Sequence, residues 1–168
     1  ATAIATAYTQ ADLTGTWNIN VLETGSNDRW MRGTATVDSS GFVSLSFIDS
    51  GGNILLPAAN SIRWTIDAHG EISGSGLNEA DQVHMTMTSN RNLIVGTGTA
   101  SGKQLRIMQK MVPGTAYSNA DVQGRSFAYH QLGVGEAAYA GWEHGTGTTD
   151  AAGLMTLTTT YDPAGPLT

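Results

Sequence analysis

The histidines are the first residues to test for chemistry, because an imidazole can bind a metal or act as a general base. The chain of 168 residues contains His69, His84, His130 and His144. None of them belongs to a His-x-His pair or a Glu-x-x-His motif, so the spacing of a metal site is missing. We predict surface histidines without a metal or cofactor, with a site assembled across strands as the alternative.

Carboxylates and nucleophiles are also poorly arranged for catalysis. The richest oxygen cluster, Asp49 to Asn53, lacks the further acidic positions of a calcium loop. The sequence has no Gly-x-Ser-x-Gly motif and no cysteine, which excludes thiolate chemistry. A glycosidase needs two paired carboxylates, and the candidate glutamates are scattered: Glu71, Glu79, Glu136 and Glu143. We therefore predict that the chain is not an enzyme.

Two tryptophans are better candidates for contact with a ligand. Trp30 and Trp142 each fall on the polar phase of a strand pattern, beside Arg32 and His144 respectively. An aromatic side chain on an outward face can form a platform for a sugar ring or a partner protein. The alternative is that each tryptophan packs against a neighbouring strand, loop or repeat. These four residues form the predicted ligand-binding set.

An internal repeat relates the two tryptophans. Residues 7–15 (AYTQADLTG) match residues 116–124 (AYSNADVQG) at an offset of 116 − 7 = 109, and residues 30–41 match residues 142–153 at 142 − 30 = 112. We predict a first β-meander repeat over residues 1–110 and a partial second repeat over residues 111–168. The second copy either completes or packs on the same β structure, or belongs to a longer array.

The elements that carry these residues are predicted to be strands. Apolar and polar residues alternate with the period of a half-buried strand. The predicted inward residues are Trp17, Ile19, Val21; Met31, Gly33, Ala35, Val37; Val43, Leu45, Phe47; Ile62, Trp64, Ile66; Val83, Met85, Met87; Leu105, Ile107; Phe127, Tyr129; and Leu154 to Leu157. Asp-x-x-Gly turns begin at Asp38, Asp67 and Asp150, with glycine at the positive-φ position. We predict an all-β, antiparallel up-and-down meander of about eleven strands, as a barrel or sandwich, with propeller-like blades as the alternative.

One short segment resembles a known family. Leu13-Thr14-Gly15-Thr16-Trp17-Asn18 is similar to the first strand of avidin-type and lipocalin-type barrels, where a Gly-x-Trp closes the barrel floor. The resemblance covers only these residues, and the second copy has Arg125-Ser126-Phe127 instead. It implies a meander barrel. It does not imply biotin binding, because the ordered tryptophans of an avidin cavity cannot be traced in the remaining sequence.

Composition narrows the function classes. The net charge is −6, from 8 Lys+Arg and 14 Asp+Glu, which disfavours nucleic acid and anionic membranes as partners. Low charge, high glycine and no cysteine favour an exported bacterial protein, although no segment reads as a signal peptide or a membrane span. We expect a non-catalytic, secreted or surface-located bacterial β-repeat module for adhesion, assembly or ligand binding, whose partners are other repeats or subunits in a homo-oligomer. The alternatives are a carbohydrate-binding module that uses the tryptophans, and a barrel that holds a small apolar ligand.

Overall fold

The computed structural model describes residues 7–25, 28–56, 62–75, 82–99, 102–133 and 141–162. The chain divides into two compact units, Ala1–Pro113 and Gly114–Thr168. The described residues contain twelve strands and two helical turns of three or four residues, so the predicted all-β class is confirmed. Within them, no helix has the length and apolar character needed to cross a membrane.

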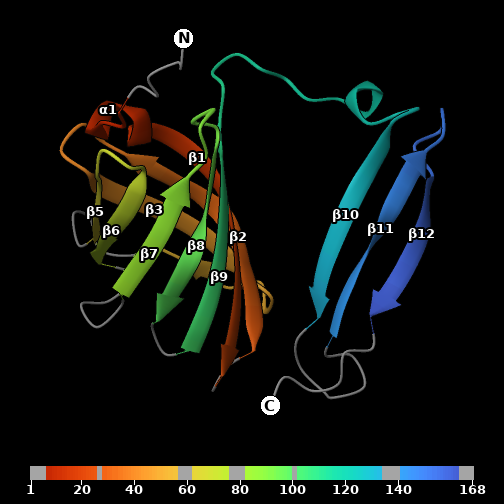
Figure 1. Cartoon of the computed structure of the whole chain (residues 1–168), viewed down its shortest axis with the longest axis horizontal. Helices are drawn as coiled ribbons and strands as arrows, with labels where there is room; N and C mark the ends of the chain where they lie inside the picture. Colours follow the sequence, from red (N-terminus) through yellow and green to blue (C-terminus); the bar gives the residue numbers. More distant parts are fainter. Residues whose placement is uncertain are drawn as a thin grey trace, which may run out of the picture. The chain divides into compact units, whose positions relative to one another are not determined.

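The first unit is a closed antiparallel barrel (Figure 1). Eight strands form the ring, each paired with the next along the chain, and β9 pairs with β1 to close it. The two-residue β4 pairs with β3 beside the ring. The strands are β1 (Gly15–Gly25), β2 (Arg29–Val37), β3 (Phe42–Asp49), β4 (Ile54–Leu55), β5 (Ile62–Ile66), β6 (Glu71–Ser75), β7 (Gln82–Met87), β8 (Leu93–Thr99) and β9 (Gly102–Lys110). The predicted up-and-down meander is therefore confirmed, in its barrel form.

Most of the predicted inward residues do form the barrel core. In β1, Trp17, Ile19 and Val21 are buried, while Asn18 and Asn20 between them are exposed. The same alternation holds in β3, β5 and β7. Hydrophobic alternation was a sufficient guide for these strands because one face of each meets the core and the other meets water.

The prediction for β9 was wrong. Leu105 is only partly buried and Ile107 is 42% exposed, whereas Gln104, Arg106 and Met108 point into the barrel. A one-residue change of register turns every side chain of a strand to the opposite face. The register of β9 is fixed on both sides by its ladders to β1 and β8, and these ladders place its polar residues inside.

The Asp-x-x-Gly turns have the predicted geometry. The Oδ1 atom of Asp38 accepts hydrogen bonds from the amides of Ser40 and Phe42, at 2.8 and 2.9 Å. Asp67 and Asp150 accept the equivalent pair of bonds in their own turns. The closing glycine of each turn has a positive φ between 82° and 88°. These hairpins are thus specified locally.

The second unit is a three-stranded antiparallel sheet preceded by a single 3₁₀ turn. Its elements are η1 (Asn119–Asp121), β10 (Ser126–Gly133), β11 (Gly141–Thr149) and β12 (Met155–Asp162). Among the residues that the structure describes, these strands pair only with one another. That residues 111–168 repeat, complete or pack on the first β structure stays a prediction.

Candidate functional site

One end of the barrel interior is polar. Glu23 on β1 is 0% exposed, and Gln104 and Arg106 on β9 are 3% and 5% exposed. The β1–β9 ladder pairs Glu23 with Gln104 and Val21 with Arg106, so the three polar side chains lie on neighbouring inward positions. The closure of the barrel therefore brings them together from distant parts of the sequence.

These side chains form a continuous hydrogen-bonded chain. The Nε and Nη2 atoms of Arg106 donate to Gln104 Oε1, at 3.0 and 2.5 Å. Gln104 Nε2 donates to Glu23 Oε2 at 2.8 Å. Arg29 Nη2 forms an ion pair with the same carboxylate oxygen at 3.1 Å, and its side chain is 26% exposed. This series of hydrogen bonds thus runs from the partly exposed guanidinium of Arg29 to the buried guanidinium of Arg106, and it links β2, β1 and β9.

A small cavity adjoins the inner end of this cluster. Its volume is about 10 Å³, which is the space of one water molecule. Gln104 and Arg106 line one part of its wall. The apolar part of the wall consists of Ile19, Val21, Met31, Leu45, Phe47 and Trp64. The cavity therefore combines an apolar surface with the donors of a guanidinium.

A glycine makes room for the buried guanidinium. Gly98 on β8 pairs with Gln104 on β9, next to Arg106. A Cβ atom added at Gly98 would lie 2.8 to 3.0 Å from the Nη2, Cζ and Nε atoms of Arg106. These distances are too short for ordinary contacts, so the guanidinium occupies the space that any larger residue would fill.

The opposite end of the barrel is covered by α1 (Gln10–Leu13) (Figure 1). The indole of Trp17 is fully buried, and its Nε1 donates to the carbonyl oxygen of Leu13 at 2.8 Å. Lys110 Nζ lies 5.1 Å from the centre of the Trp17 ring and donates to the carbonyl oxygen of Asp12 at 2.7 Å. These contacts make this end a floor. Kinship with avidin-type or lipocalin-type barrels stays a prediction.

The Asp12 carboxylate holds this floor to the neighbouring β7–β8 turn. Burial opposes ionisation of Asp12, but hydrogen bonds from the amide and hydroxyl of Thr9, with the charges of Arg91 and Lys110, outweigh it and keep its pKa below 3.8. The ion pair between Arg91 Nε and Asp12 Oδ1 spans 3.0 Å. The Arg91 guanidinium also lies 5.3 Å from the centre of the Tyr8 ring.

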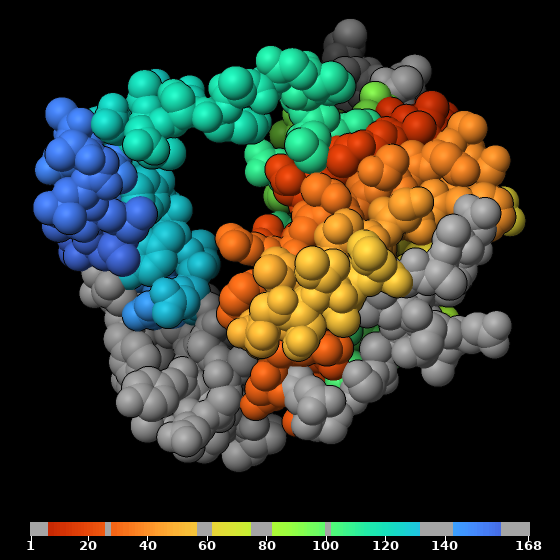
Figure 2. Space-filling model, turned by 180° about the vertical axis from the view of Figure 1, so that it is seen from behind, coloured from red at the N-terminus to blue at the C-terminus, as the bar shows by residue number. Residues whose placement is uncertain are grey.

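The residues predicted to contact a ligand lie elsewhere. Trp30 is 46% exposed on the outer face of β2, and the Arg32 guanidinium lies 5.8 Å from the centre of its ring. The outer wall of β2, β3 and β4 is the orange and yellow surface in Figure 2. In the second unit, His144 stacks on His130 with ring centres 6.0 Å apart. Trp142 lies on β11, where its backbone pairs with β10 and β12, but its side chain lies outside the described residues.

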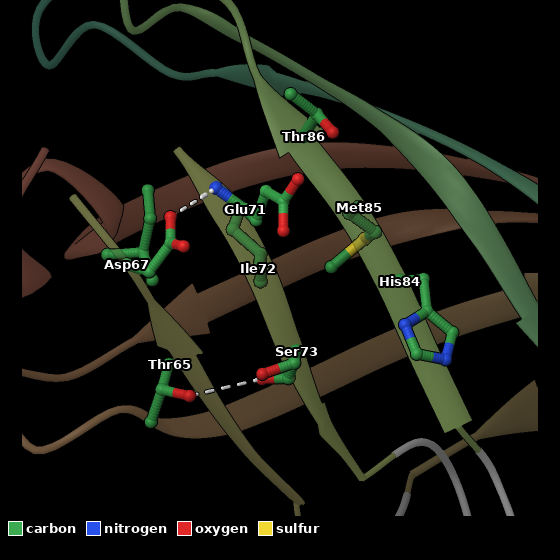
Figure 3. Close-up of a pocket in the computed structure, with 9 residues that line it drawn as sticks. Thr65, Asp67, Glu71, Ile72, Ser73, His84, Met85 and Thr86 are labelled. Carbon is green, nitrogen blue, oxygen red and sulfur yellow. Dashed lines mark hydrogen bonds between the residues drawn. The ribbon is translucent and has the colours of Figure 1, made fainter. Parts of the chain in front are cut away.

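A separate polar groove of about 420 Å³ crosses the outside of the barrel over β5, β6 and β7 (Figure 3). His84 lines it, on the outward face predicted from the sequence. The Asp67 carboxylate also lines it, and hydrogen bonds from the amides of Glu71 and His69 hold its pKa below 3.8. Thr65 Oγ1 donates to the carbonyl oxygen of Ser73 at 3.5 Å. This groove is open and polar, and among the described residues its lining contains no tryptophan, tyrosine or phenylalanine that could serve as a platform.

Sequence reasoning missed the interior cluster. The sequence pattern does not single out Glu23, and it predicts Gln104 and Arg106 on the outward face because their neighbours are Leu105 and Ile107. The one available signal was Met108, which continues the alternation of Gln104 and Arg106 with an apolar residue. Within the described residues, no three histidine or acidic side chains are grouped as metal ligands would be.

Comparison with known proteins adds little about function. No protein-family model matches the sequence, and no curated protein matches it. A redesigned β-barrel, mFAP1, whose structure holds DFHBI, is 14% identical with a TM-score of 0.47, over 61% of this chain and 98% of that one. A de novo designed fluorescence-activating β-barrel is 13% identical with a TM-score of 0.38, over 58% of this chain and 93% of that one. Neither similarity is high enough to support a functional argument, which must come from the site.

Proposed function

We propose that the barrel binds a small ligand in its interior and does not catalyse a reaction. The observation that carries this proposal is the Glu23–Gln104–Arg106 cluster beside the cavity. Burying an ion costs several kcal/mol even after relaxation, and apolar side chains of similar volume would avoid that cost. Departures of this kind from an apolar core concentrate at functional sites.

The lining of the cavity defines the kind of ligand. Leu45, Phe47 and Trp64 offer an apolar surface, and the Arg106 guanidinium brings a positive charge that suits a carbonyl or carboxylate oxygen. Ligand sites typically combine a mainly apolar wall with a few polar groups that fix orientation. The ligand is therefore a small molecule with an apolar body and an oxygen-bearing head group.

The core must rearrange to admit such a ligand, because the cavity has room for only one water molecule. Methionine is the side chain best suited to this, since it is unbranched and adopts many shapes at low cost. Met31 lines the cavity, and Met85, Met87 and Met108 are buried in the same core. The partly exposed Arg29 marks the end of the barrel at which the polar cluster reaches solvent, opposite the α1 floor.

A titration with hexanoate, hexanamide and hexanol tests the proposal. Trp64 lines the cavity, so we expect a saturable change in tryptophan fluorescence that is absent from Trp64→Phe. Amide chemical shifts should move most at Met31, Leu45 and Arg106. Uniform shifts without saturation, or shifts confined to the outer groove over β5–β7, would refute interior binding.

Two matched variants separate interior from surface binding. Val21 lines the cavity, whereas its neighbour Leu22 lies on the other face of β1. Val21→Phe should fill the cavity and abolish the titration, and Leu22→Phe should leave it intact, provided that circular dichroism shows both variants folded. Equal binding by both would place the ligand elsewhere.

The remaining sequence-based functions stay proposals. A secreted or cell-surface module for adhesion would use the outer face, and carbohydrate binding would use Trp30 with Arg32. The exposed indole and the neighbouring guanidinium are the observation in its favour. A glycan array compared between the wild-type protein and Trp30→Ala tests it, because identical binding by both would exclude Trp30 as the platform.

A further inference from the structure

Two of the four histidines lie directly opposite each other in the second unit. His130 and His144 are 144 − 130 = 14 residues apart in the sequence, and they pair across the adjacent strands β10 and β11 (Figure 1). Their ring centres are 6.0 Å apart, and the ring planes differ by 21°. Directly opposite residues of an antiparallel pair extend to the same face of the sheet, so the two imidazoles share one surface.

That surface is the polar face of the sheet. His130 is exposed and His144 is partly exposed. The neighbouring pair on the same face, Ala128 with Thr146, is exposed as well. Both imidazoles therefore belong to a single sheet, on a face where a small hydrated ion can reach them.

The separation of the rings fits two imidazoles that share one metal ion. Metal–nitrogen bonds of about 2.0–2.1 Å place each ring centre about 3 Å from the ion, so two rings on one ion have centres about 5–6 Å apart. The observed 6.0 Å lies at the upper end of this range. Because the rings are nearly parallel, each must turn about its Cβ–Cγ bond to direct a nitrogen at a common ion. The energy of that torsion varies little with angle in histidine.

The other two histidines are not arranged in this way. His84 on β7 lies between Ser73 on β6 and Thr97 on β8. His69 lies in the turn that begins at Asp67, where its amide donates to the Asp67 carboxylate at 2.8 Å. Among the described residues, a cross-strand pair of histidines therefore occurs only on β10 and β11.

Strand pairing does not itself require histidine at these positions. The predicted repeat aligns residues 142–153 with residues 30–41, so His144 corresponds to Arg32. In the barrel, Arg32 pairs directly with Asn20 across β2 and β1. A guanidinium has no lone pair to offer a metal ion, so the corresponding pair in the barrel lacks this chemistry. The two imidazoles are thus a specific property of the second unit.

We propose that His130 and His144 together bind one late transition-metal ion, Zn²⁺, Ni²⁺ or Cu²⁺. Imidazole nitrogen suits these ions, whereas Mg²⁺ and Ca²⁺ prefer oxygen ligands. Two protein ligands leave the remaining coordination positions to water, so this is an open, exchangeable site and not a closed structural one. The order of metal affinities makes Cu²⁺ the tightest ligand of the three.

Calorimetric titration of the full chain with each of the three ions tests the proposal. The chain must carry no histidine tag, and a background of about 5 mM Mg²⁺ occupies carboxylate sites that prefer hard cations. We expect one ion per chain, bound roughly tenfold or more weakly by His130→Ala and by His144→Ala. His84→Ala is the matched control, because it removes a strand histidine that has no histidine opposite, and it should bind like the wild type.

Electron paramagnetic resonance of the Cu²⁺ complex identifies the ligands. The hyperfine pattern should show two nitrogen ligands in the wild-type protein and one in either alanine variant. Binding that needs no imidazole would leave the pattern unchanged by both substitutions, which would overturn the proposal.

Amide hydrogen exchange of the wild-type protein keeps the test decisive if a variant fails to fold. An ion held by both strands opposes their separation, so amide protection in β10 and β11 should rise about 100-fold when free Zn²⁺ is about 100 times its dissociation constant. Protection of the barrel should not change. Three results would overturn the proposal: no binding in the presence of Mg²⁺, equal binding by the wild type and both alanine variants, or protection that Zn²⁺ leaves unchanged in β10 and β11.

Discussion

Replacing Gly98 with alanine tests the placement of the buried guanidinium. The new methyl group would lie 2.8 to 3.0 Å from three atoms of Arg106, so the guanidinium must move away. The guanidinium is the flexible end of its side chain, but it is enclosed in the barrel, so its shift should break at least one of its two hydrogen bonds to Gln104, at 3.0 and 2.5 Å. The perturbation is confined to the interior cluster because the backbone of Gly98 is not in the positive-φ region.

Two opposing effects set the magnitude. Loss of one hydrogen bond that involves a charged group costs about 1.5–3 kcal/mol. Glycine in a strand is less favourable than alanine by roughly 0.5–1 kcal/mol, which offsets part of this cost. We expect Gly98→Ala to lower the free energy of unfolding by about 1–2 kcal/mol. Urea unfolding followed by circular dichroism measures the change.

A double-mutant cycle decides whether Arg106 causes the effect. In an Arg106→Met background the added methyl group meets a flexible thioether, so Gly98→Ala should become neutral or slightly stabilising. Thr97→Ala, on the exposed face of the same strand, should change stability by less than about 0.5 kcal/mol. If Gly98→Ala stabilises the wild-type protein as much as it stabilises Arg106→Met, the guanidinium does not lie over Gly98 and the interior site is wrong.

Three further outcomes follow from the structure. Lys110→Met should cost about 1–2 kcal/mol in urea unfolding, because it loses a cation–π contact and a hydrogen bond to the floor, whereas the exposed Lys103→Met should cost little. The pKa of Asp67 is depressed when folded, so its contribution is complete above 3.8 and is lost as the pH falls through the folded value. Asp67→Asn keeps a side-chain acceptor in the turn but should reduce the loss of stability at acid pH. An unchanged loss would contradict the depressed pKa of Asp67. Gly145→Ala should abolish amide protection in β11 and β12, because the methyl group would overlap the Thr158 carbonyl, and retained protection would show that the close approach is absent.

Sequence patterns predicted those parts of the fold in which local and global preferences agree. The alternation of Trp17, Ile19 and Val21 predicted the buried face of β1, and the turn at Asp38 predicted the hairpin between β2 and β3. In β9, however, the sequence pattern allows either set of alternate residues to face the barrel interior. Burying Leu105 and Ile107 would have stabilised the core by about 1.5–3 kcal/mol each on transfer energies alone, which is why the sequence-based prediction chose the wrong face.

The sequence by itself determined which segments are strands, where they turn and how most of them face, because these features depend on residues that are close along the chain. Only the tertiary structure decided that the meander closes and that a charged cluster forms inside it. Glu23 and Gln104 are 81 residues apart and meet only because β9 pairs with β1. Backbone hydrogen bonds between strands carry no sequence information, so no local pattern states which distant strand will complete the barrel.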